Sequence, residues 1–160
     1  MIMKKNIFLQ AIIFILLLVV SNSLTAQILT DNVKGEITKA LELWNAAAKN
    51  SNVDQAMSLF DDSENILLVG SDSGEVFKGK NQIKEWLTQL FDYASFSWEM
   101  DRIDIDYSGN TAWVFVDGKM VVETKAGKIR KPLYRFTGIL VKKGNEWKWS
   151  LFNGSNPRPE

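Results

Sequence analysis

Hydrophobic residues recur at intervals of three and four in the first part of the chain, and this spacing predicts helices. The first apolar face comprises Val33, Ile37, Leu41, Trp44 and Ala48. The polar residues 50–52 end this helix and can cap a second one over 53–60. A third helix is predicted to begin at Asn81 and to bury Ile83, Trp86, Leu87, Leu90 and Phe91. Two short apolar runs, 66–69 and 75–78, lie between the second and third helices and are predicted strands.

After Phe91 the apolar spacing changes from three or four to two, which is typical of strands. The pattern predicts four long strands, 95–105, 111–122, 129–141 and 146–153, joined by turns that contain glycine or asparagine. The apolar phase slips by one residue in the first of them, which predicts a β-bulge near Asp101 and Arg102. Helices followed by an antiparallel meander indicate an α+β fold.

The first 26 residues differ from the rest of the chain. Lys4 and Lys5 precede an apolar run from Ile7 to Val20, and small and polar residues follow up to Ala26. This order predicts a signal peptide over 1–26, removal of which leaves a single domain over 27–160. A membrane-spanning helix needs about 20 apolar residues, so the run is short for an anchor, although an uncleaved anchor is the alternative. We therefore expect an exported protein, periplasmic or extracellular, with no membrane association after cleavage.

The composition excludes several kinds of chemistry. The chain contains no cysteine and no histidine. Catalytic Ser-His-Asp triads, cysteine nucleophiles, disulfides and zinc sites built from thiolates or imidazoles are therefore impossible. The 19 basic and 19 acidic residues balance, and the two leader lysines leave a slight negative charge on 27–160. A nucleic-acid partner, which requires a basic face, is not expected, and neither is a cofactor.

Three aspartates in one strand raise the question of a metal site. Asp101, Asp104 and Asp106 lie close together, and the residues from Asp104 resemble the start of a calcium-binding loop. The twelfth position of that loop is Phe115, where calcium binding requires a bidentate glutamate. We interpret the aspartates as a solvated strand edge and predict no metal.

Four sequence segments together resemble the SnoaL-like domain family of the nuclear transport factor 2-like superfamily. They are 65–80, the Gly109-to-Val114 strand opening, the Tyr134-to-Gly138 segment and the closing Trp147-to-Pro157 segment. The similarity extends from Thr30 to Pro157. It implies three N-terminal helices packed on a strongly bent antiparallel sheet that encloses a conical cavity.

The resemblance also implies which strand faces line the cavity. It turns Arg135 inward, where it could hold a carboxylate or carbonyl of a ligand. The alternative is a scaffold ion pair of Arg135 with Asp104 or Asp117. The implied ligand pocket comprises Trp98, Trp113, Arg135, Thr137, Trp149, Asn153 and Ser155. The six tryptophans of the chain can line such a pocket or form core, and core is favoured for those on the helical faces.

The opposite face of the third long strand carries Tyr134, Phe136 and Leu140. If exposed, these residues would form an unusual apolar patch for a monomer. Related domains often dimerise through this face, so a homodimer through these three residues is expected.

A non-catalytic module that binds a small apolar or aromatic ligand with a polar end, or an interaction module, is the function that these patterns favour. Many members of the resembled family carry a histidine in the last strand, where this chain has Asn153, and asparagine does not titrate. The alternative is a cofactor-independent isomerase, cyclase or dehydratase that uses a buried carboxylate. Asp117 is then the first candidate for a catalytic residue, followed by Glu99 and Asp72.

Overall fold

The computed structural model describes residues 30–158 of the chain. The predicted signal peptide, 1–26, lies outside the described residues. The chain divides into two parts, Met1–Gly35 and Glu36–Glu160. Residues 30–35 of the first part are helical, and the second part contains the strands of the sheet. Within the described residues, no helix has the length and apolar character needed to span a membrane.

The predicted helices are present. Residues 36–49 are helical and bury Ile37, Leu41 and Trp44, as the apolar spacing predicts. Helix α2, Val53–Ser58, begins at the predicted cap, because the Asn52 side chain accepts a hydrogen bond from the Gln55 amide at 2.9 Å. Helix α3, Gly79–Tyr93, starts two residues before Asn81, so the predicted cap was wrong.

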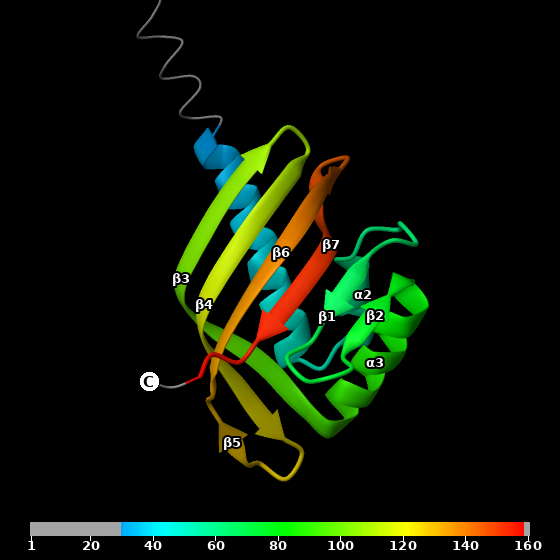
Figure 1. The fold of residues 1–160 in the computed structure, drawn as a ribbon, viewed down its shortest axis with the longest axis vertical. Helices are drawn as coiled ribbons and strands as arrows, with labels where there is room; N and C mark the ends of the chain where they lie inside the picture. Colours follow the sequence, from blue (N-terminus) through cyan, green and yellow to red (C-terminus); the bar gives the residue numbers. More distant parts are fainter. Residues whose placement is uncertain (1–29, 159–160) are drawn as a thin grey trace, which may run out of the picture. The chain divides into compact units, whose positions relative to one another are not determined.

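The strands form one mixed sheet in the order β2-β1-β7-β6-β4-β3 (Figure 1). Its members are β1 Leu67–Val69, β2 Val76–Lys78, β3 Ala94–Ser108, β4 Thr111–Thr124, β6 Leu133–Lys143 and β7 Glu146–Ser155. The short β5, Ile129–Arg130, pairs with β4. Strand β1 runs parallel to β7, whereas the other pairs are antiparallel. The predicted α+β class is confirmed, but the sheet is mixed rather than purely antiparallel.

Two irregularities bend the long strands. The register of β3 against β4 shifts between Met100 and Arg102, which confirms the predicted bulge. A second shift lies between Ile139 and Leu140, where β7 carries Ser150 as an extra residue. Pro132, which has no amide hydrogen for a ladder, separates β5 from β6 within the strand predicted over 129–141.

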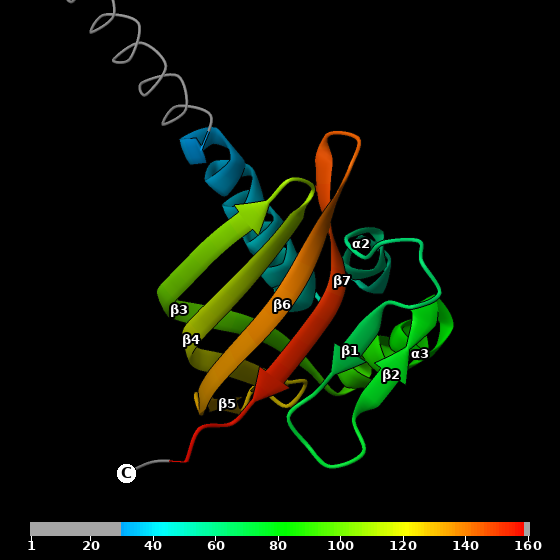
Figure 2. The ribbon, with the colours of Figure 1, turned by 45° about the horizontal axis from the view of Figure 1, so that its top comes forward.

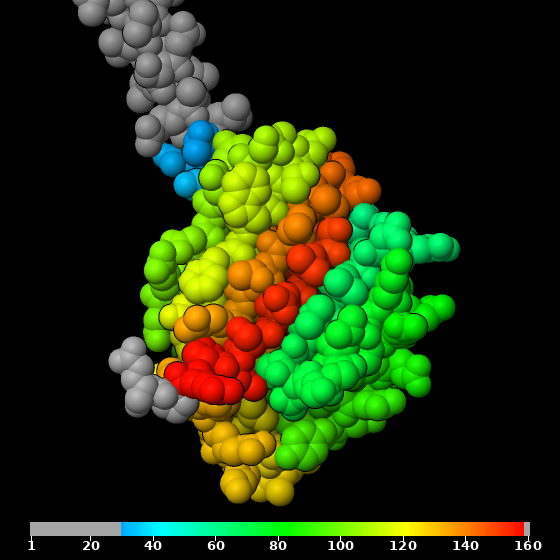
Figure 3. All heavy atoms as spheres, viewed as in Figure 1, coloured from blue at the N-terminus to red at the C-terminus, as the bar shows by residue number. Residues whose placement is uncertain are grey.

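The helical residues 36–49 cross one face of the sheet and cover it, as Figures 1 and 2 show. This inner face holds the core, which includes Phe136, Leu140 and Trp149 at 1%, 0% and 0% exposure. The outer face of β4, β6 and β7 carries no helix from the second part of the chain and is seen directly in Figure 3. Successive side chains along these strands therefore point alternately into the core and towards the outer surface.

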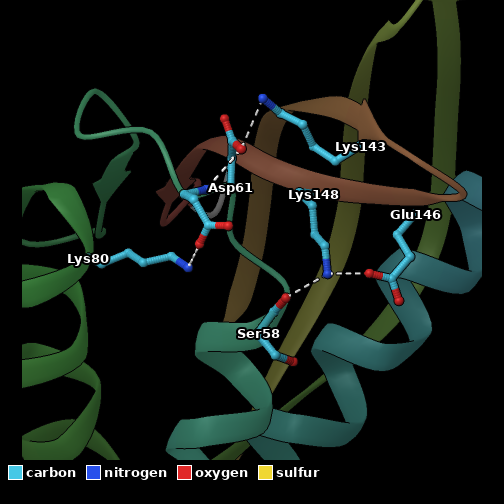
Figure 4. A network of polar contacts seen from close by, with 7 residues as sticks. Ser58, Asp61, Lys80, Lys143, Glu146 and Lys148 are labelled. Carbon is cyan, nitrogen blue, oxygen red and sulfur yellow. Dashed lines mark hydrogen bonds and ion pairs between the residues drawn. The ribbon is translucent and has the colours of Figure 1, made fainter.

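A polar network ties α2 and the following loop to the β6–β7 hairpin (Figure 4). The buried Asp61 pairs with Lys143 at 3.2 Å and accepts a hydrogen bond from the Asp62 amide at 2.8 Å. Lys80 pairs with Asp62 and lowers the pKa of that carboxyl by its hydrogen bond. Lys148 pairs with Glu146 at 2.6 Å. Each lysine of the network has an acidic partner, so we interpret it as scaffold rather than as a binding site.

Candidate functional site

A cavity of about 140 Å³ lies on the inner side of the sheet, between the strands and the helices. Its wall is largely aromatic and comprises Trp44, Trp86, Phe91, Phe96, Trp98, Tyr134 and Phe152. Polar lining comes from the β1–β2 loop, which contributes Ser71, Asp72 and Glu75. A wide surface groove adjoins the cavity and shares Asp72, Phe96 and Met120 with it.

The aromatic wall is held by contacts between rings. The indoles of Trp44 and Trp98 stack, with centroids 6.0 Å apart and planes inclined by 24°. The ring centroids of Trp98 and Tyr134 are 6.3 Å apart. The backbone amide of Trp98 donates a hydrogen bond to the Asn45 side chain at 2.8 Å. Helical residues 44 and 45 therefore both contact Trp98 of β3, and these contacts fix the position of its indole in the cavity wall.

Tyr134 contributes a phenol hydroxyl to the cavity. Tyr134 is only 6% exposed, and no hydrogen bond joins its hydroxyl to another described residue. Burial raises the pKa of the phenol well above its ordinary value, and the charges of Glu75 and Asp72 raise it further. The hydroxyl therefore stays protonated and can both donate and accept a hydrogen bond.

A glycine on the neighbouring strand makes room for this hydroxyl. A Cβ added to Gly154 would lie 1.8 Å from the oxygen of Tyr134. No side chain larger than hydrogen fits there while the phenol keeps its position. Gly154 therefore belongs to the site, although it has no functional group.

The β1–β2 loop positions the two carboxylates. Glu75 folds back over Gly70, where an added Cβ would be 2.0 Å from the carboxylate oxygen. The same oxygen accepts a hydrogen bond from the Asp72 amide at 3.0 Å. Neither Asp72 nor Glu75 forms an ion pair within the described part of the chain. The loop thus holds two negative charges beside the aromatic wall without a compensating cation.

The structure places the predicted pocket residues differently from the sequence prediction. Trp98 lines the cavity, whereas Trp149 is wholly buried and packs against Trp44, Phe136 and Phe152. Trp113 lies on the outer face and is 47% exposed. The four polar members of the predicted pocket are also exposed and do not line the cavity, namely Arg135, Thr137, Asn153 and Ser155.

The predicted inward orientation of Arg135 was therefore wrong, and so was the dimer patch on the opposite face. Tyr134, Phe136 and Leu140 point inward and are buried, so they are core and cavity wall rather than an interface. The physical reason is the period of two: assigning the wrong parity reverses every side chain of a strand. In β7 the extra Ser150 also places Trp149 and Asn153 on opposite faces.

The three acidic residues considered as catalytic candidates lie in different places in the structure. Asp117 lies opposite Arg135 in the β4–β6 ladder and pairs with it at 3.4 Å on the outer face. Glu99 pairs with Lys131 at 2.5 Å, and this hydrogen bond lowers the pKa of the carboxyl. Of the three, only Asp72 lines the cavity. Asp117 is thus a scaffold residue, as the alternative of an ion pair with Arg135 anticipated.

Sequence reasoning missed Tyr134 and Glu75 as cavity residues. They are far apart in the chain, and no local pattern joins them. Among residues 30–158, no group of acidic side chains is arranged to hold a metal ion.

Comparison with known proteins identifies the relatives of the chain. A family model for the SnoaL-like domain matches residues 37–159. A structure from Streptomyces avermitilis, assigned provisionally as a dehydratase of the nuclear transport factor 2-like family, superposes with a TM-score of 0.73 at 14% identity, over 81% of this chain and 99% of that one. A nuclear transport factor 2-like superfamily protein from Salmonella enterica gives 0.71 at 18% identity, over 81% and 94%.

A third structure, a ketosteroid isomerase-like protein from Erwinia carotovora, gives a TM-score of 0.65 at 18% identity, over 78% of this chain and 96% of that one. At these identities the structural likeness establishes the fold alone. No curated protein sequence matches the chain.

Proposed function

We propose that this chain, which belongs to the SnoaL-like domain family, is an exported, non-catalytic module that binds a small ring-bearing molecule in the aromatic cavity. The observation that carries the proposal is a set of polar groups on cavity-lining residues that have no hydrogen-bond partner among the described residues: the buried indole N–H groups of Trp44 and Trp98, and the hydroxyl of Tyr134. A buried polar group left unpaired is costly. A ligand with a hydroxyl, carbonyl or amine would satisfy it.

The size of the cavity limits the ligand. A cavity of about 150 Å³ lined by apolar side chains is known to accept benzene, and this one encloses about 140 Å³. The cavity therefore has room for one six-membered ring, and a short substituent would extend towards the adjoining groove. Because Arg135 lies on the outer face, the ligand's polar end is assigned to Tyr134 and the β1–β2 loop instead.

A binding module accounts for the acids better than an isomerase does. A proton-transfer enzyme needs a carboxylate beside the bound ligand in a site that excludes water. Asp117 and Glu99 are paired outside the cavity. Asp72 and Glu75 line it, but Asp72 is exposed and the Glu75 carboxylate, which is only half-buried, accepts a hydrogen bond from the Asp72 amide. None of the three candidate acids is buried in the cavity.

We expect Tyr134→Phe to weaken ligand binding without weakening the fold. The variant keeps the ring and removes only a hydroxyl that has no protein partner. A neutral hydrogen bond contributes about 0.5–1.5 kcal/mol, so the dissociation constant for 2-phenylethanol should rise about two- to tenfold. Tryptophan fluorescence titration measures this, because Trp44 and Trp98 line the cavity.

Tyr107→Phe is the matched control, since Tyr107 does not line the cavity. Its affinity should equal that of the parent protein. If 2-phenylethanol and related single-ring compounds do not bind the parent at concentrations up to about 10 mM, which is weaker than most ligand sites of this size, the cavity is not a binding site.

Export is proposed from residues 1–26, on the charged, apolar and small-residue order of the leader. Protein recovered outside the cytoplasm should begin at Gln27, or at its cyclised form, in intact-mass spectrometry. Recovery with Met1 in a membrane fraction would instead support the uncleaved anchor.

We also propose a homodimer that forms through the outer face of the sheet. Trp113, Ile139 and Leu151 are register partners in one row across β4, β6 and β7. Trp113 and Ile139 are 47% and 37% exposed, and a shallow depression runs along the row. An uncovered apolar row of this kind is typical of an interaction surface.

A second copy of the chain is the partner that the charges favour. Arg135 and Asp117 pair on this face, as do Arg102 and Asp104 at 2.7 Å. The face therefore carries balanced charge, and two copies related by a twofold axis would not repel one another.

A further inference from the structure

The charged residues that line the cavity determine whether it favours a cationic, a neutral or an anionic ligand. Asp72 and Glu75 are the charged residues that line it, and both are acidic. Within the described residues neither has a cationic partner. Arg130 and Lys131 line the adjoining groove rather than the cavity, and Lys131 is engaged by Glu99. An anionic ligand would therefore meet two negative charges that no protein cation neutralises.

The aromatic wall of the cavity also favours a cationic ligand. The faces of indole and phenol rings are electronegative and attract cations. Trp44, Trp98 and Tyr134 present such rings beside the carboxylates. The protonated phenol of Tyr134 offers its oxygen lone pairs to an ammonium group as an acceptor.

The two carboxylates line the same cavity as the phenol of Tyr134. Their charges, together with burial, raise the pKa of Tyr134. The Glu75 carboxylate is also held in place by the Asp72 amide and lies over Gly70. The Glu75 carboxylate is thus held in one position by the loop.

We infer that the cavity is a site for an organic cation: a single ring with a short chain that ends in an ammonium group. The ring lies against the aromatic wall, and the ammonium group is bound by Asp72, Glu75 and the oxygen of Tyr134. This inference rests on the proposed binding function and specifies the chemical class of its ligand.

Three probes with similar ring and chain but different charge test it. They are 2-phenylethylamine, 2-phenylethanol and 3-phenylpropionate, which at neutral pH carry charges of about +1, 0 and −1. We expect the amine to bind the parent protein at least about tenfold more tightly than the alcohol, because hydrogen bonds to charged groups are stronger than neutral ones. The acid should bind more weakly than the alcohol.

Paired variants separate the local charges from net charge. Asp72→Asn with Glu75→Gln keeps side-chain shape, and the glutamine oxygen can still accept from the loop amide. This variant should bind amine and alcohol with affinities within about threefold of each other. Asp92→Asn with Glu123→Gln removes the same net charge outside the cavity and should keep the parent's preference.

The outcomes distinguish the two proposals. If the alcohol binds but the amine has no advantage, or if the acid binds best, the cation inference is overturned and the binding function stands. The cation inference is also overturned if the cavity variant keeps the preference for the amine. If none of the three probes binds the parent, the proposed binding function itself fails and the inference fails with it.

Discussion

Phe136→Glu is expected to prevent folding, whereas Thr137→Glu, one residue further along β6, is expected to leave the fold intact. Phe136 is 1% exposed and packs against Trp98, Trp149 and Phe152, with ring centroids at 5.9, 6.3 and 5.0 Å. Loss of a buried phenylalanine costs about 3–5 kcal/mol, and an unpaired buried carboxylate adds several more. A domain of this size has about 5–15 kcal/mol of stability in total.

The measurement is the soluble yield together with the urea unfolding transition. Phe136→Glu should give insoluble protein or no cooperative transition. Thr137→Glu, on the exposed face, should remain soluble and keep a cooperative unfolding transition. Phe136→Leu, which keeps the position apolar, should fold with a measurable loss of stability. It shows how much stability is lost with the ring alone, without a buried charge. A soluble, well-folded Phe136→Glu protein would contradict the inward assignment of this face.

The positions of the elements could be predicted from the sequence because they depend on local periodicity. The buried face of helical residues 37, 41 and 44 follows from a spacing of three and four. The bulge between Met100 and Arg102 appears in the sequence as a slip in the alternation. Both signals lie within about ten residues and need no tertiary information.

The buried face of β6 also follows from composition, although the family resemblance implied the opposite face. One parity carries Tyr134, Phe136 and Leu140, and the other carries Arg135 and Thr137. Burying the first set removes much more apolar area from water, and burying the second would desolvate a guanidinium group. The residues themselves therefore indicate the core. In β7 the signal is weaker, because the slip at Ser150 interrupts an aromatic alternation that resumes at Phe152.

The cavity could not be predicted in the same way. Tyr134, Glu75 and Trp44 come from β6, the β1–β2 loop and the first helix. Their meeting depends on the parallel pairing of β1 with β7, a long-range contact with no local sequence signal. Gly154 is a further example, since its role is visible only from the tyrosine oxygen beside it.

The outer face yields the second large expected effect: Trp113→Lys should convert a dimer into monomers. Trp113 is the most exposed large residue of the row formed with Ile139 and Leu151. In a twofold dimer one substitution places a lysine in both halves of the interface. Truncating an interface tryptophan commonly costs about 2–4 kcal/mol, so the dissociation constant should rise about thirty- to a thousandfold.

Sedimentation velocity over roughly 1–100 μM, a range that brackets micromolar dimers, measures the effect. Tyr93→Lys is the control, because Tyr93 is also a large exposed aromatic residue, at 57%, but belongs to α3 rather than to the outer face. It should sediment as the parent does.

Trp113→Lys should remain folded, since its side chain is half exposed and contributes little to the core. A parent protein that is monomeric at about 100 μM, or a Trp113→Lys protein that still dimerises as tightly as the parent, would show that this row does not form the interface. Because the core variant acts on stability and this one on association, the two substitutions test opposite faces of the same sheet independently.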